Sequence, residues 1–313
     1  MSLLIGTLGG AYLLPNDGSD PIRTLDATVH RLRSFDVGCF AATSEGLYRT
    51  TDGQTWQSVG TSTCDVTSVV LSPDGERLYV GMKPAAVYVT SDEGATWSEL
   101  DSLQTLPDRD RWRDRAQGEG ACVRTMVVHP NAPDRLAVGI EPGGVYLSVD
   151  GGETWTSRSN GVHDDVHHLL ALDVDEYVAA CGNGFYRTED AGRTWVRQDT
   201  DFRDFWYTYF RETIRHDGTL YTAANGWGPA EPSGALFEVT GDDVARVPYP
   251  GENDSFVVSW AEDRGTLYAG TMDVTDGFGR YDPGRILRRE SSGWFEVATV
   301  PAAPRTLATV QVA

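Results

Sequence analysis

The chain has 313 residues, with 26 Lys+Arg against 46 Asp+Glu and a formal net charge of −20. Binding to nucleic-acid phosphates or to an anionic membrane surface requires a basic face, so this charge argues against both as main partners. A hydrophobic content of 40% with nine Trp is enough for a packed core. No segment approaches the ~20 apolar residues that span a bilayer. Because residues 1–14 lack a basic leader, we expect a cytoplasmic protein without membrane insertion.

The kind of charge is more informative than its sum. The acids are 30 Asp and 16 Glu, and the bases are 25 Arg and a single Lys, Lys83. This composition resembles that of halophilic, haloarchaeal proteins, in which a dense carboxylate surface stays hydrated while its self-repulsion is screened over about 3 Å at 1 M salt. The alternative is an acidic protein from a high-GC bacterium.

The first segments of the chain are three short apolar or β-branched runs, which we predict to be strands: Leu3–Thr7, Gly10–Leu14 and Ile22–Leu25. They correspond to the second, third and fourth strands of a repeated unit whose first strand is missing. At the other end of the chain, Arg305–Val310 resembles the first strand of a later unit, Val123–Val128. We therefore predict that the C-terminal strand joins the N-terminal unit and closes a ring.

Four regular units and two degenerate ones follow between these ends. The regular units start at Val29, Val66, Val123 and Val166. The third of them is predicted as four strands: Val123–Val128, Arg135–Gly139, Gly144–Ser148 and Thr154–Arg158. The degenerate units are predicted as Leu220–Ala223, Gly234–Val239 and Val244–Pro248, and as Phe256–Trp260, Thr266–Gly270, Arg285–Arg289 and Trp294–Val297.

Each regular unit carries the pattern S/T-x-D-x-G-x-T-W at the turn into its last strand, one residue shorter in the first copy, with the Trp residues 41, 58 and 40 positions apart. The Asp and Trp residues are Asp52, Trp56, Asp92, Trp97, Asp150, Trp155, Asp190 and Trp195. The pattern resembles the Asp-box, or BNR repeat, of sialidase-like, sortilin-like and photosystem assembly factor-like β-propellers. The resemblance implies an all-β, seven-bladed propeller of four-stranded antiparallel blades in one domain, 1–313; six or eight blades fit the units less well.

The residue types of the repeat have a structural explanation. An Asp side chain accepts hydrogen bonds from N–H groups later in its own turn, and the Gly two positions on supplies a positive φ. The Trp then buries a large apolar face between neighbouring units. We therefore expect the repeat Asp residues to be structural and not catalytic.

All long insertions are predicted to lie on the face opposite these turns. They are Leu100–Ala121, Asp199–Phe205 with the following Trp206, Asn225–Ser233 and Met272–Gly284. Function on rigid scaffolds lies on such loops, so we predict a partner-binding face built from Trp112, Trp206, Trp227 and Phe278. The charged run around Trp112 fits either a salt-bridged lid or short helix, or a recognition arm.

Several basic residues fall early in the predicted inner strands. They are Arg31, Arg124, His167, His168 and Arg305. If they point inward, they form a basic channel mouth for a small anion or glycan; the alternative is that they pair with nearby acids such as Asp65 and Asp165. We predict no metal site, because adjacent His residues on a strand point to opposite faces and because the four Cys lack C-x-x-C spacing. Whether Cys64 and Cys122 pair stays open.

The resemblance implies a non-catalytic binding or scaffold propeller for a protein or a small anionic or glycan ligand, acting as a monomer without a cofactor. The alternative is a sialidase-like glycoside hydrolase, for which Tyr209 and Glu212 are the catalytic candidates beside the inner-strand arginines. The Arg-Ile-Pro signature of sialidases is missing, since Pro21-Ile22-Arg23 has the wrong order. A lyase-type propeller with a channel His is a third class.

Overall fold

The fold is a seven-bladed β-propeller, as predicted. The computed structural model describes residues 2–60, 64–112, 120–200, 207–226, 233–241, 243–249, 255–273 and 282–310. In these residues, 28 strands form seven four-stranded antiparallel sheets, and the helical elements are two short 3-10 helices. No helix in these ranges is long and apolar enough to cross a membrane. The chain divides into two compact units.

Unit 1 comprises residues 1–44, 48–58 and 201–313 and holds four of the sheets. In the first sheet, the C-terminal β28 (Pro304–Val310) pairs with β1 (Ser2–Thr7), which confirms the predicted closure. That sheet continues with β2 (Gly10–Leu14) and β3 (Ile22–Leu25). The other sheets are β4 (Val29–Phe35), β5 (Gly38–Thr43), β6 (Gly46–Thr50) and β7 (Gln57–Ser58); β20 (Tyr207–His216), β21 (Thr219–Gly226), β22 (Ser233–Thr240) and β23 (Asp243–Val247); and β24 (Ser255–Asp263), β25 (Thr266–Asp273), β26 (Gly284–Glu290) and β27 (Gly293–Val300).

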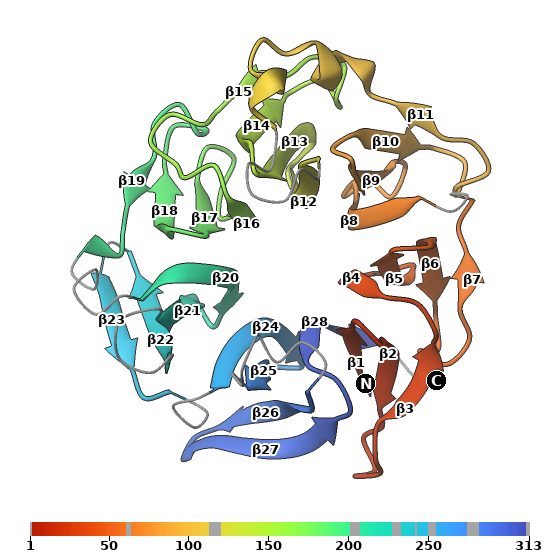
Figure 1. The fold of residues 1–313 in the computed structure, drawn as a ribbon, viewed down its shortest axis with the longest axis vertical. Helices are drawn as coiled ribbons and strands as arrows, with labels where there is room; N and C mark the ends of the chain where they lie inside the picture. Colours follow the sequence, from red (N-terminus) through yellow and green to blue (C-terminus); the bar gives the residue numbers. More distant parts are fainter. Residues whose placement is uncertain are drawn as a thin grey trace. The chain divides into compact units, whose positions relative to one another are not determined.

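Unit 2 comprises residues 45–47 and 59–200 and holds three sheets. They are β8 (Asp65–Leu71), β9 (Leu78–Lys83), β10 (Val87–Thr90) and β11 (Ser98–Glu99); β12 (Cys122–His129), β13 (Ala132–Glu141), β14 (Gly144–Ser148) and β15 (Thr156–Ser157); and β16 (Val166–Ala171), β17 (Tyr177–Cys181), β18 (Gly184–Thr188) and β19 (Val196–Arg197). Their first strands, β8, β12 and β16, lie next to one another (Figure 1). The 3-10 helices η1 (Asp101–Thr105) and η2 (Arg109–Arg111) lie between β11 and β12.

The first strand of each sheet contains the same irregularity, a β-bulge near its beginning. In β12 the register shifts between Val123 and Thr125, so Arg124 has no residue opposite it. The corresponding bulge residues include His30, His167 and Arg305. A bulge redirects one side chain out of the regular alternation. The register therefore places Arg124, Arg305, His30 and His167 at equivalent positions of their first strands.

The residue after the bulge links neighbouring sheets in several blades. The Thr125 hydroxyl accepts a hydrogen bond at 3.2 Å from the Leu169 N–H of the next first strand. Thr306 accepts in the same way from Leu32 at 3.1 Å, and Ser259 from Leu307 at 3.0 Å. These groups are buried, so each bond satisfies a backbone donor that water cannot reach.

The repeat turns have the predicted hydrogen bonds. Asp150 accepts from the Thr154 N–H at 2.9 Å and from the Thr154 hydroxyl at 2.5 Å. Gly152, at φ +99°, donates to the Ser148 hydroxyl at 2.7 Å. Trp155 is buried in a core cluster that also contains residues of the preceding sheet, and Trp195 is buried in the next such cluster. The turn Asp and Trp residues therefore shape the blades and their junctions.

The turn carboxylates give the fold an acid-sensitive component. Hydrogen bonds from Thr154 lower the pKa of Asp150 to about 2 from its ordinary value of 3.8. The stabilisation is therefore complete above about pH 4 and is lost as the pH falls through about 2. We expect Asp150→Asn to lower the melting temperature at neutral pH, with a difference from the wild type that shrinks as the pH falls from about 4 to 2. Glu153→Gln, at an exposed acid of the same turn, is the matched control; a pH-independent difference for Asp150→Asn would contradict the assignment.

The four cysteines are free thiols in the structure. Cys39 and Cys181 are buried, as expected for small apolar side chains, whereas Cys64 is exposed. Burial raises the pKa of the Cys39 thiol to about 12. The structure therefore gives no disulfide between Cys64 and Cys122.

Candidate functional site

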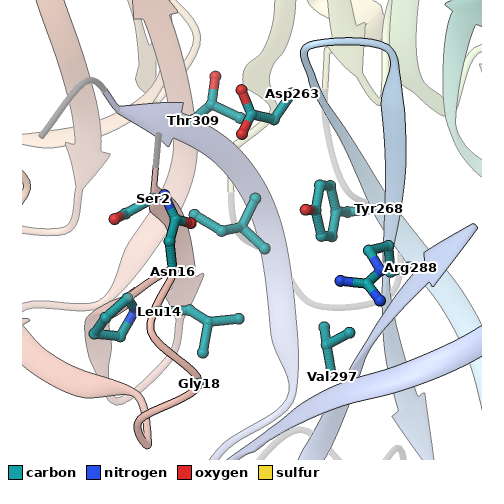
Figure 2. A pocket seen from close by; sticks show the side chains of 11 residues that line it. Ser2, Leu14, Asn16, Gly18, Asp263, Tyr268, Arg288, Val297 and Thr309 are labelled. Carbon is teal, nitrogen blue, oxygen red and sulfur yellow. The ribbon is translucent and has the colours of Figure 1, made fainter.

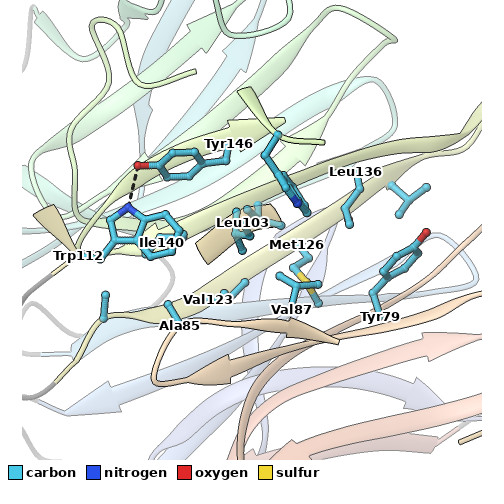
Figure 3. Packing of buried hydrophobic residues seen from close by; sticks show 14 residues of the cluster. Tyr79, Ala85, Val87, Leu103, Trp112, Val123, Met126, Leu136, Ile140 and Tyr146 are labelled. Atoms are coloured by element: carbon cyan, nitrogen blue, oxygen red, sulfur yellow. Dashed lines mark hydrogen bonds between the residues drawn. The ribbon is translucent and has the colours of Figure 1, made fainter. Parts of the chain in front are cut away.

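The described part of the first insertion, residues 100–112, is anchored to unit 2 by Trp112. The Trp112 side chain is 1% exposed and packs in the cluster that contains Leu103 and Ile140 (Figure 3). Its Nε1 donates a hydrogen bond to the Tyr146 hydroxyl at 2.8 Å, and the two rings meet edge to face at 5.1 Å. The prediction that Trp112 rims an exposed face is therefore wrong, because the indole lies in the apolar core.

Polar contacts fix the same insertion. The Asp108 carboxylate accepts from the Tyr146 hydroxyl at 2.9 Å and from Ser157 at 3.1 Å. The Arg109 guanidinium lies over the Trp112 ring, 4.8 Å from its centroid. Residues 109–111 form a short 3-10 helix, which favours the lid or short-helix interpretation of this charged run over a free arm. Asp110 and Arg111 remain exposed.

The other predicted partner-face residues, Trp206, Trp227 and Phe278, lie outside the described residues, so their role stays a prediction. Two predicted loop boundaries are corrected. Strand β21 runs through Gly226, and β25 runs through Asp273. Asn225 and Met272 are therefore strand residues and not loop residues, because ladder pairing continues past the points where the apolar pattern weakens.

Unit 2 brings two of the predicted ligand-binding residues together with two acids. The Arg124 Nε lies 3.1 Å from Oε2 of Glu141, and the His167 Nε2 lies 3.2 Å from Oδ1 of Asp165. One ligand atom from each of Glu141, Asp165 and His167 lies within 4.8 Å of the others. These residues are at the end of β13 and the beginning of β16, on the same side of the blades as the insertion. We call Arg124, Glu141, Asp165 and His167 the mouth cluster.

The mouth cluster is partly buried. Burial by itself raises the pKa of Asp165, but the hydrogen bond and charge of His167, with a contribution from Arg124, lower it overall. Asp165 therefore remains ionised at neutral pH. A Cβ at position 182 would lie 2.0 Å from Oδ2 of Asp165, so Gly182 makes room for this carboxylate.

Unit 1 contains a second charged group, around Glu212 of β20. Arg31 donates to Oε1 of Glu212 at 2.9 Å, and Arg33 lies 3.5 Å from the same oxygen. Oε2 accepts from the Trp260 N–H at 3.2 Å, and Arg31 and Glu212 are both 5% exposed. Trp260 is two residues after its bulge, as Leu169 is. Glu212 thus accepts a hydrogen bond from a backbone N–H of the next blade, as the Ser259, Thr125 and Thr306 hydroxyls do in other blades.

The remaining predicted residues lie in separate environments. His168 is buried next to the bulge in β16, and Arg305 is the half-buried bulge residue of β28. The Tyr209 ring is half-buried, with the Arg211 guanidinium 5.0 Å from its centroid. Because Arg31 and Arg124 each pair with an acid, the structure supports the ion-pair alternative at these two positions.

Sequence reasoning missed Glu141 and underrated Asp165. Glu141 ends β13 directly opposite Cys122, two residues before Arg124. Glu141 could have been found from the predicted meander. The second strand runs antiparallel to the first, so its last residue must lie near the first residues of the inner strand. Asp165 was named only as a partner for a neighbouring base.

A cavity of about 150 Å³ lies in unit 1, between the N-terminal sheet and the sheet of β24–β27. Leu14, Tyr268, Arg288 and Val297 are among the residues that line it (Figure 2). The β2–β3 turn and the end of β24 border it, so it lies on the side of the repeat-type turns. Small-molecule sites typically measure about 300–1,000 Å³, and this cavity is smaller.

Blades with bulged first strands, repeat turns and the charged mouth cluster of unit 2 define a β-propeller protein with its candidate site on the insertion side. The model of the DUF6242 beta propeller domain matches residues 24–204, more than half of the chain. The chain therefore belongs to the DUF6242 β-propeller family. No curated protein sequence matches it significantly.

Solved structures share the fold at low sequence identity. The Niastella koreensis GH74 enzyme is 16% identical over 94% of this chain and 46% of its own, with a TM-score of 0.63. YCF48 bound to D1 peptide is 16% identical over 86% and 82%, with a TM-score of 0.55. The WD40 repeats of RRP9 are 12% identical over 91% and 84%, with a TM-score of 0.60. The chain spans less than half the length of the GH74 structures it matches. At these identities the likeness concerns the fold alone.

Proposed function

We propose that the chain is a non-catalytic binding propeller that presents its insertion face to a protein, with a small anionic or glycan ligand as the other candidate. The observation that carries this proposal is the fixed insertion. Trp112 and Asp108 hold residues 100–112 against unit 2 while Asp110 and Arg111 stay exposed. A surface that is already ordered loses less conformational entropy on binding. Among the structures of the same fold, one is YCF48 bound to D1 peptide.

Crosslinking from matched positions tests the proposal. A photoreactive residue replaces Asp110 on the insertion or, as the control, Glu153 on a repeat turn; both acids are exposed. We expect a discrete adduct with a cellular protein from position 110 and none from position 153. Equal adducts from both positions, or none from position 110, would contradict a dedicated insertion face.

The alternative is a sialidase-like glycoside hydrolase. Carboxylate oxygens of Glu141 and Asp165 lie within 4.8 Å of each other, and many glycosidases other than sialidases act with a pair of nearby carboxylates. Against it, Arg124 pairs with Glu141, and the lowered pKa of Asp165 is the opposite of what a general acid needs. Hydrolysis of xyloglucan or sialyl-lactose that is lost in Glu141→Gln would replace the binding proposal.

The proposal also includes the class of the repeat, the oligomeric state, the location and the salt adaptation of the protein. The hydrogen bonds of the repeat turns support their interpretation as Asp-boxes. The net charge of −20 supports a monomeric protein adapted to molar salt, and the proposal includes a cytoplasmic location. We expect the melting temperature to rise as KCl increases from about 0.1 M to about 3 M, because the Debye length shortens and acidic self-repulsion is screened. A melting temperature that is flat or falling over this range would contradict halophily.

A further inference from the structure

We propose that Glu141, Asp165 and His167 of the mouth cluster bind a divalent first-row transition metal, Zn²⁺ in particular. The three side chains come from adjacent sheets of unit 2, and one ligand atom from each lies within 4.8 Å of the others. The proposal goes beyond the binding function and does not depend on it. It also differs from the sequence-based expectation of no metal.

The donor set selects the class of metal. One imidazole and two carboxylates are ligands that Zn²⁺ accepts, at about 2.0–2.2 Å. Mg²⁺ and Ca²⁺ prefer oxygen ligands alone. Three protein ligands leave at least one coordination position open, as at zinc sites that hold water or another small ligand.

The fold arranges the ligands before any metal arrives. His167 is the bulge residue of β16 and is 3% exposed, and its Nε2 points toward Asp165. Gly182 leaves the space that the Asp165 carboxylate occupies.

The proposed site is consistent with the rule that adjacent His residues on a strand point to opposite faces. Only His167 belongs to the trio, and His168 does not. Arg124 is compatible with the site because it contacts Oε2 of Glu141, and a carboxylate has a second oxygen. Carboxylate ligands of metals are commonly oriented by such a contact from outside the coordination sphere. The Arg124 side chain is 23% exposed, so its positively charged guanidinium can move outward into solvent when the metal ion binds beside Glu141.

The test is calorimetric titration of the full chain with ZnCl₂, and with MgCl₂ in parallel, in about 1 M KCl to screen diffuse cation binding by the acidic surface. We expect one Zn²⁺ per chain, no comparable Mg²⁺ binding, and an affinity at least about tenfold lower in Asp165→Asn and His167→Gln. Asp164→Asn is the matched control, because this neighbouring acid is 74% exposed and outside the trio. It should bind Zn²⁺ as the wild type does.

Circular dichroism first establishes that each variant is folded; if Asp165→Asn and His167→Gln are not, Glu141→Gln is measured instead. Zn X-ray absorption should show an oxygen shell with one imidazole. Three results would overturn the proposal: no saturable binding, equal losses in Asp164→Asn and Asp165→Asn, or a sulfur ligand, which would point to the exposed Cys64. None of these results bears on the crosslinking experiment, so the two proposals fail separately.

Discussion

Replacing Trp112 by alanine should lower the free energy of unfolding by about 3–5 kcal/mol, the usual cost of truncating a buried Trp. The indole is 1% exposed and packs between the insertion and the cluster that contains Leu103, Ile140 and Tyr146. Its removal leaves a cavity and takes away the donor to the Tyr146 hydroxyl. Chemical denaturation followed by far-UV circular dichroism measures the change.

Two further variants separate the components of this effect. Trp112→Phe keeps an aromatic ring and loses the Nε1 donor, so we expect a part of the full loss, with about 1 kcal/mol from the hydrogen bond. Val149→Ala, at a side chain that is 62% exposed, should stay within about 0.5 kcal/mol of the wild type. A Trp112→Ala protein as stable as Val149→Ala would mean that the insertion is not part of the folded core.

Replacing Glu212 by alanine should destabilise the fold by about 3–5 kcal/mol, because it removes the carboxylate that the buried Arg31 guanidinium contacts. Arg31 and Glu212 are both 5% exposed, and Glu212 also accepts from the Trp260 N–H. The same denaturation experiment measures this loss. A loss of this size would show that the Glu212 carboxylate stabilises the junction between blades, which is a structural role and not a catalytic one.

The matched control removes both charges. The double variant Arg31→Met with Glu212→Leu should recover much of the lost stability, because buried ion pairs are commonly replaceable by apolar residues of similar volume. A Glu212→Ala protein with wild-type stability would disprove the structural role. It would also restore Glu212 as a catalytic candidate beside Tyr209.

The sequence predicted the fold in detail because its signals are local and repeated. The turn residues around Asp150 and Gly152 interact within a few positions, so spacing alone reveals them. Strand Gly144–Ser148 was predicted with the observed bounds, whereas β15 is shorter than predicted, at Thr156–Ser157. The position of the last strand was predicted because its residue pattern matches the first strand of another unit, and β28 pairs with β1 in the structure.

The candidate site was only half predictable. Arg124 and His167 were identified from their repeat position, but their acid partners depend on where strands end and which blades adjoin. Trp112 was predicted as exposed because Trp in a charged run is typical of binding surfaces. Whether a Trp faces solvent depends on whether a neighbouring core has room for it.

By itself, therefore, the sequence determined the seven-bladed architecture and the repeat turns, since each depends on contacts a few residues apart or on an internal repeat. Only the tertiary structure decided the partners of the charged side chains. Arg31 and Glu212 are 181 residues apart in the chain, and a bulge changes which side chains meet. Long-range pairing of this kind depends on the packing of blade against blade, which no local pattern encodes.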